Sequence, residues 1–264
     1  RHAERELSDA FQNISSSINY ASRIQKSILP ANDDLARRFD EHFVIWEPRD
    51  VVGGDVYWCH AWGEGQLVLL GDCTGHGVPG AFMTLISTGA LERAMAEVEV
   101  GDVPALVQRM HQLVRQSLGQ DGANANANDG LELGVCYVQP GRKQLTFVGA
   151  RFDLFVVRSG GVELVKSSKK GIGYPEVPTD QIFEASVIDA APGTRFYMTT
   201  DGAIDQINDA ERRRFGKARF KELLMSVQEM SMPVQGEEIL KTIEDYQGAA
   251  PRLDDIAVVG FNIG

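Results

Sequence analysis

The chain has 264 residues, 43% of them hydrophobic, and its 26 basic and 37 acidic residues give a net charge of −11. This length can bury the core of one large domain. The acidic balance argues against nucleic acid and against an anionic membrane as a partner, because both bind basic surfaces. No apolar run is long enough to span a bilayer, and the three cysteines form no CxxC pair. We therefore expect reduced, buried cysteines in a cytoplasmic chain that does not contact the membrane.

Residues 1–29 contain no glycine or proline and precede Pro30, which predicts a helix that ends there. Its apolar residues recur at alternating intervals of four and three, the period of a coiled-coil seam. They are Leu7, Phe11, Ile14, Ile18, Ala21 and Ile28, with Gln25 interrupting the series. Either a dimerising stalk or an amphipathic helix lying on its own domain fits this pattern. Because the chain opens inside the helix, we expect the natural protein to extend further at its N-terminus and to include a sensor, with or without a membrane anchor.

Downstream of this helix, short strand patterns alternate with pairs of helical patterns. Strands are expected at 42–48, around 56–58, and at 66–72, 131–139, 143–149, 152–159, 162–166, 181–188, 195–200 and 255–263; helices are expected at 78–97, 103–118, 218–230 and 237–247. Short turns suggest that the four strands from 131 to 166 form a meander. The apolar face of the 78–97 helix should consist of Phe82, Leu85, Ile86, Gly89 and Ala90. The polar loop at 119–130 is either an inert surface loop or a mobile flap. The pattern predicts an α+β fold of two antiparallel sheets packed together, with helices outside.

Aspartates stand where several of the apolar strands begin or end. Burying an ionised carboxylate in such a place costs free energy of folding unless another group or ion offsets its charge. The residues are Asp55, Asp72, Asp201, Asp205, Asp254 and Asp255. We interpret them as acids that converge on divalent metal ions.

A hairpin geometry supports this interpretation for two of the acids. If the turn WGEG is centred between Gly63 and Glu64, Asp55 lies directly across from Asp72. Like charges in opposed positions repel, and a bound cation would turn that repulsion into attraction. A shifted register that leaves both acids in solvent is the alternative.

Other site chemistries fit the sequence poorly. The run from Gly75 to Gly80 matches GxGxxG, but a second helix follows where a dinucleotide-binding fold needs a strand. No GxSxG, HExxH or EF-hand loop is present. His76, inside the glycine-rich turn, either shuttles protons or stabilises the turn. Oxygen-only ligands suit Mg²⁺ or Mn²⁺, and two such ions bridged by a carboxylate would activate a bridging hydroxide to attack phosphorus in line.

Four segments, VGGDVYW, GDCTGHGVPGAF, TTDGAID and DDIAVV, resemble in order and spacing the bacterial SpoIIE-like branch of the PPM family. These are metal-dependent protein serine/threonine phosphatases related to protein phosphatase type 2C. The segments IQKSILP and WEPRDVVGGD make SiaA-type phosphatases the most similar kind within the branch. The resemblance covers about residue 20 to the end. It implies the PPM sandwich at 31–264, after a helical linker at 1–30.

Site residues follow from this resemblance. It implies that Asp55 and Asp72 are the central metal ligands, with Asp72 bridging two Mn²⁺ or Mg²⁺ ions and the Cys73 carbonyl as a further ligand. Asp201 would complete one shell, and Asp205 would touch a weaker third ion. In the closing doublet the family's ligand falls on Asp254, with Asp255 as a hydrogen-bonding residue; the reverse assignment stays open. Arg49 is close to the place of the family's phosphate-holding arginine, although a surface role is also compatible. His76 is the second candidate for holding the substrate's phosphate.

The resemblance also implies a substrate and an assembly. Enzymes of this branch remove phosphate from phosphoserine or phosphothreonine on small regulatory proteins related to anti-sigma-factor antagonists. They tend to dimerise through the helix before the domain, in agreement with the heptad pattern of residues 1–29. A different class of function, a metal-stabilised module that binds a phosphorylated partner without hydrolysing it, is the alternative.

Overall fold

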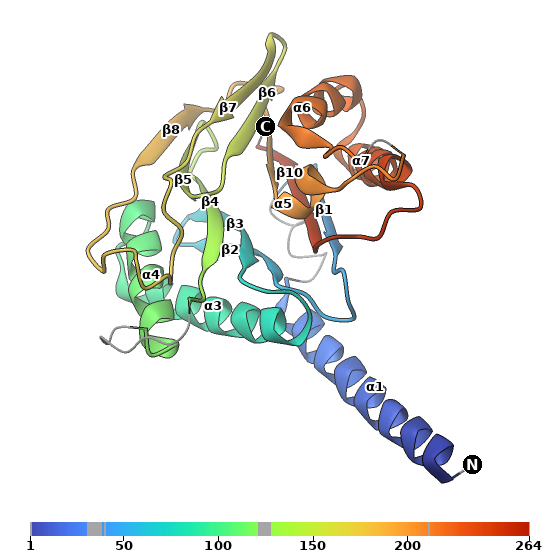
Figure 1. Ribbon diagram of the computed structural model, residues 1–264. Coiled ribbons are helices and arrows are strands. Elements are labelled where there is room, and N and C mark those ends of the chain that lie inside the picture. The colour runs from blue at the N-terminus through green and yellow to red at the C-terminus, as the bar shows by residue number, and fades with distance from the viewer. Residues whose placement is uncertain (1, 31–38, 40, 121–127, 211, 264) are drawn as a thin grey trace.

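The computed structural model describes residues 2–30, 39, 41–120, 128–210 and 212–263. Two five-stranded antiparallel sheets lie face to face, with helices on their outer sides (Figure 1). This arrangement confirms the predicted α+β sandwich. Most of the 31–40 link and the centre of the 119–130 loop fall outside the described residues, so the proposed flap is not tested.

Each sheet combines strands from distant parts of the chain. The first has the order β1 (His42–Glu47), β10 (Ile256–Asn262), β9 (Arg195–Thr199), β6 (Leu154–Arg158) and β7 (Gly161–Val165). The second has the order β2 (Asp55–Trp62), β3 (Gly65–Cys73), β4 (Leu131–Val138), β5 (Gln144–Ala150) and β8 (Ala185–Asp189). The first and last strands of the domain therefore pair, which brings the closing acidic doublet beside the residues that follow β1.

The predicted four-strand meander is wrong. Hairpins join β4 to β5 and β6 to β7, but β5 pairs with β8 and β6 pairs with β9. The chain changes sheets at Arg151, whose backbone adopts the left-handed region with φ 57°. Turn residues reveal which strands form hairpins but not which sheet a hairpin joins, because both sheets offer similar apolar faces.

Three apolar layers hold the sandwich together. Between the sheets, large side chains such as Phe147, Phe196 and Phe261 are almost fully buried. Helices α3 (Gly77–Glu97) and α4 (Val103–Ser117) cover the second sheet. Helices α6 (Gly216–Val227) and α7 (Met232–Gln247) cover the first. All three cysteines are buried, as expected, and no disulfide joins them.

Helix α3 buries a face that matches the predicted one only in part. Ala90 is buried and Ile86 packs against the core, as predicted. Phe82 and Leu85 are instead 62% and 40% exposed, and Met83 and Leu91 face the core. The helix is apolar around most of its circumference, so hydrophobic spacing alone does not select the buried face. Its exposed apolar side borders the end of helix α1 (His2–Ile28), where both helices line a cleft of about 210 Å³.

Helix α1 projects away from the sandwich at the N-terminal end of the chain (Figure 1). Its first half exposes the apolar side chains of Leu7, Phe11 and Ile14. Only its last turns join the domain, where Ser22 and Gln25 are buried and Leu29 packs against the core. No helix within the described residues is long and apolar enough to cross a membrane.

Candidate metal centre

The two aspartates on neighbouring strands β2 and β3 lie directly opposite each other. Asp55 begins β2 and pairs with Asp72 of β3, in the register that the hairpin turn predicted. Opposed residues of an antiparallel pair have Cβ atoms about 4.5–5.5 Å apart. Asp55 is buried and Asp72 is half-buried, so both carboxyl groups are partly or wholly withdrawn from solvent. They repel unless a proton or a cation offsets their charge.

The protonation of both groups reflects this crowding. Burial raises the pKa of Asp55 well above its ordinary range, and the charges of Asp255, Asp254 and Asp201 raise it further, against a hydrogen bond from Thr200. Burial, followed by the charges of Asp55, Asp201, Asp254 and Glu132, raises the pKa of Asp72 to about 10. Without a cation, the folded protein therefore retains protons on this pair at neutral pH.

The third acidic segment forms a short helix that sequence reasoning did not predict, α5 (Asp201–Asp205). Asp201 begins it, and burial together with the charges of Asp254 and Asp205 raises the pKa of Asp201, against a hydrogen bond from Asp72. Asp205 lies at the other end of α5, where its Oδ2 forms an ion pair of 2.8 Å with Arg214. Asp201 therefore contacts Asp72, whereas Asp205 is paired with the Arg214 side chain.

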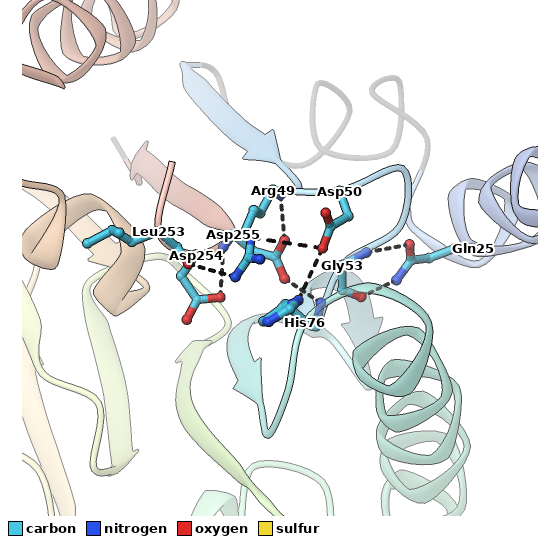
Figure 2. Close-up of polar contacts among 9 residues, drawn as sticks. Gln25, Arg49, Asp50, Gly53, His76, Leu253, Asp254 and Asp255 are labelled. Carbon is cyan, nitrogen blue, oxygen red and sulfur yellow. Dashed lines mark hydrogen bonds and ion pairs between the residues drawn. The ribbon is translucent and has the colours of Figure 1, made fainter. Parts of the chain in front are cut away.

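The closing doublet places its two carboxylates in different surroundings (Figure 2). Asp255 is buried, and its two oxygens accept the backbone N–H groups of Arg49 and Gly54, each at 2.6 Å. Asp254 is only half-buried; its Oδ1 accepts the backbone N–H of Asp255 at 2.9 Å, and its charge acts on Asp55, Asp72 and Asp201. Among the described residues, no hydrogen bond engages the second oxygen of Asp254, whereas both oxygens of Asp255 hold the segment before β2.

Arg49 and His76 lie at the edge of this acidic group (Figure 2). The Arg49 guanidinium donates to the Leu253 carbonyl at 3.1 Å and lies 4.0 Å from Asp50 Oδ2. His76 Nδ1 lies 3.1 Å from the same oxygen, and its side chain is 45% exposed. Both predicted phosphate-site residues are therefore gathered around Asp50, which sequence reasoning did not single out.

The glycine-rich turn shapes the remaining wall of the site. Gly75 and Gly77 have φ of 85° and 63°, a region that residues with a Cβ rarely adopt. The Cys73 thiol points into the core, 3.6 Å from Ser87 Oγ. Its carbonyl oxygen would lie 3.0 Å from a Cβ added to Gly54, so it faces the segment before Asp55. Cys73 can thus offer the site only its backbone oxygen.

Sequence reasoning missed two residues that act on these carboxylates. The Thr200 hydroxyl, fully buried, donates to Asp55 Oδ2 at 2.8 Å and accepts the Ala257 N–H at 2.9 Å. Glu132 lies opposite Asp72 on β4 and is 3.5 Å from Arg151. Pairing β4 with β3 from their apolar alternation could have found Glu132. The position of Thr200 depends on the meeting of the two sheets, so no local signal reveals it.

We predict that Thr200→Val lowers the free energy of unfolding by about 1–3 kcal/mol, because it leaves a buried carboxyl oxygen and a buried N–H without a partner. It should also weaken metal binding, since the hydroxyl orients Asp55. Urea unfolding and manganese titration of the variant measure the two effects. Thr199→Val is the matched control: the Thr199 hydroxyl bonds only the next carbonyl, so a loss as large as that of Thr200→Val would contradict the assignment.

The donor set fits hard divalent cations. It consists of carboxylate and carbonyl oxygens, which Mg²⁺ and Mn²⁺ prefer, and among the described residues no ion pair neutralises Asp55, Asp72 or Asp254. Within the same residues, no three His, Cys, Asp or Glu side chains already form a ready coordination shell.

Comparison with known proteins places the chain in a family. The sequence profile of stage II sporulation protein E (SpoIIE) matches residues 63–263. A search of curated proteins found no match.

Among solved structures, the SiaA PP2C domain of Pseudomonas aeruginosa shares 34% identity, with 97% of this chain and 99% of that chain covered and a TM-score of 0.87. Two more distant structures share the fold. One is the PP2C domain of Bacillus subtilis SpoIIE with a fragment of its regulatory domain, at 15% identity, 84% and 62% coverage and a TM-score of 0.64. The other is the PstP catalytic domain with two manganese ions, at 14% identity, 84% and 96% coverage and a TM-score of 0.60. The chain belongs to the SpoIIE family and is a PPM-type, metal-dependent serine/threonine protein phosphatase domain.

Proposed function

We propose that this domain hydrolyses phosphoserine or phosphothreonine on a small regulatory protein of the anti-sigma-factor-antagonist type, at a centre of two Mn²⁺ or Mg²⁺ ions. The convergence of Asp55, Asp72, Asp201 and Asp254, with no ion pair to Asp55, Asp72 or Asp254 among the described residues, is the observation that carries the proposal. The charges of the other three acids all act on Asp72, which suits a carboxylate that both ions would share. The Cys73 carbonyl would be the backbone ligand.

When bound, divalent ions would supply Lewis-acid activation of water and would neutralise the phosphoryl charge. The chain's own residues prepare the site for that chemistry. Thr200 orients Asp55 from the opposite sheet, and Asp255 fixes the segment before Asp55. Asp205 can serve a third ion only by giving up its pair with Arg214.

Arg49 and His76 are the proposed contacts for the substrate's phosphate. Both reach the edge of the acidic group, and Asp50 holds them there. The Arg49 guanidinium offers several donors in one plane, which suits phosphate oxygens. Asp50 would have to share these cations with the incoming dianion.

Phosphate release from a phosphoserine-bearing antagonist protein, measured with chelator, Mg²⁺ or Mn²⁺, tests this function. We expect turnover that requires metal and that also appears with p-nitrophenyl phosphate. A folded protein that binds the phosphoprotein in every metal yet releases no phosphate would instead establish the alternative, a binding module.

We also propose a homodimer that forms through α1. Leu7, Phe11 and Ile14 are 73%, 70% and 60% exposed along one stripe of this projecting helix, and they follow coiled-coil spacing. An exposed apolar stripe of this kind commonly marks a contact with another chain.

Phe11→Glu should weaken self-association at least tenfold, because it places a charge in the apolar seam. Sedimentation velocity over a range of concentrations measures this effect. The control is Gln12→Glu, which adds the same charge beside the stripe. Equal association of the parent and both variants would contradict a dimer through this face.

A further inference from the structure

Gln25 is a buried polar side chain on a helix that is otherwise largely exposed. Only 3% of it is accessible, although its place in the heptad pattern is one that an apolar residue would fill. Long polar side chains are rarely buried this deeply unless their polar atoms are paired. The side chain lies at the end of α1, beside the segment that leads to Asp55 (Figure 2).

The amide of Gln25 bonds both backbone groups of a single residue. Its Oε1 accepts the N–H of Gly53 at 3.2 Å, and its Nε2 donates to the C=O of Gly53 at 2.6 Å. The same Nε2 lies 3.2 Å from Thr84 Oγ1 on α3. A primary amide presents a donor and an acceptor side by side, so it can bond the N–H and the C=O of one residue in this way where a carboxylate or an apolar side chain cannot.

Gly53 is directly linked to the residues of the candidate centre. The next residue, Gly54, donates its N–H to Asp255 and accepts the Cys73 N–H at 3.2 Å. Asp55 follows immediately. The packing leaves little freedom, since a Cβ on Gly53 would lie 2.7 Å from an Asp255 oxygen. A displacement of Gly53 would therefore move Asp55 and the Cys73 carbonyl together.

We propose that Gln25 is a positioning residue for the metal centre: from α1 it holds the backbone N–H and C=O of Gly53 so that Asp55 and the Cys73 carbonyl keep the spacing that metal binding requires. The proposal rests on the metal centre proposed above and adds to it that the last turns of α1 are part of the site's framework. Gln25 itself does not touch the metal or the substrate.

Gln25→Met tests the proposal in the full chain, because methionine keeps the length of the side chain and removes both hydrogen-bonding groups. Gln12→Met is the matched control, the same exchange at an exposed position of α1. Two quantities are measured in each protein: hydrogen exchange of the backbone around residues 53–55 and 73 in metal-free protein, and the dissociation constant for Mn²⁺ by calorimetry. Neither readout depends on phosphatase activity.

We expect Gln25→Met to accelerate exchange in these segments and to weaken Mn²⁺ binding by about 10- to 100-fold, the usual effect of losing an outer-shell partner. Gln12→Met should change neither. Thr84→Val, which removes the second partner of Nε2, should weaken Mn²⁺ binding in the same direction by a smaller factor, and it decides the question if Gln25→Met does not fold.

The two possible failures are distinguishable. A parent protein that binds no Mn²⁺ overturns the proposed metal centre and, with it, the role of Gln25. A parent that binds Mn²⁺ normally, with Gln25→Met unchanged in both affinity and exchange, overturns the positioning role alone, even if the variant unfolds at a lower temperature.

Discussion

Asp72→Asn should lower metal-dependent phosphatase activity by about a thousandfold. Asn keeps the shape of the side chain but loses the charge shared between two ions, and several kcal/mol of metal-supplied stabilisation correspond to about three powers of ten in rate. Initial rates of phosphate release from a phosphoserine peptide, at saturating Mn²⁺, measure the effect. A variant that retains a tenth or more of the parental rate would contradict the central place of Asp72.

The same substitution should stabilise the metal-free protein at alkaline pH. The pKa of Asp72 rises from its ordinary value of 3.8 to about 10 on folding, so between these values the folded state holds a proton that the unfolded state has lost. The free energy of unfolding therefore falls as pH rises through this window, by up to about 1.4 kcal/mol per pH unit. Asp72→Asn removes the part of this slope that Asp72 contributes, while the part that comes from Asp55 remains. Urea unfolding at several pH values, with chelator present, checks the sign.

Asp254→Asn and Asp255→Asn should have different effects on the stability of the metal-free protein. Asp255→Asn should lower the free energy of unfolding by about 2–3 kcal/mol, because an amide N–H₂ would face one of the backbone N–H groups that both carboxylate oxygens now accept. Asp254→Asn should leave the metal-free protein at least as stable as the parent, because it removes one repelling charge.

The affinity for Mn²⁺ distinguishes Asp254→Asn from Asp255→Asn independently of their stability. Asp254→Asn should weaken Mn²⁺ binding more than tenfold, whereas Asp255→Asn, measured under conditions where it is folded, should retain more of it. The opposite order of Mn²⁺ affinities would assign the ligand to Asp255 and would require its two backbone contacts to open on metal binding.

The sequence predicted the acidic hairpin because its determinants are local. A four-residue turn between two apolar strands sets the register, and the register sets the meeting of Asp55 and Asp72. The acid-bearing segments could be identified from the sequence as well, since Asp55, Asp72, Asp201 and the closing doublet stand at the ends of apolar strands. These features depend on neighbours within one hairpin or on composition at a strand end.

Features that depend on how the sheets and helices pack against one another could not be predicted from the sequence. The buried face of α3 was predicted only in part, because the helix is apolar on nearly every side. Thr200 meets Asp55 only where one sheet crosses the other, 145 residues apart in the chain. Gln25 interrupts the heptad pattern of the sequence, whereas in the structure it bonds the backbone N–H and C=O of Gly53. In each case the deciding partner is remote in sequence.

Calorimetric titration of Mn²⁺ into the metal-free domain at pH 7, in two buffers of different ionisation enthalpy, tests the metal centre most directly. The centre described here predicts two ions per chain and a buffer-dependent enthalpy, because metal binding must displace the protons held by Asp55 and Asp72. Asp72→Asn should bind fewer ions and release fewer protons. Absence of Mn²⁺ binding by the folded parent, or binding that Asp72→Asn leaves unchanged, would contradict the account.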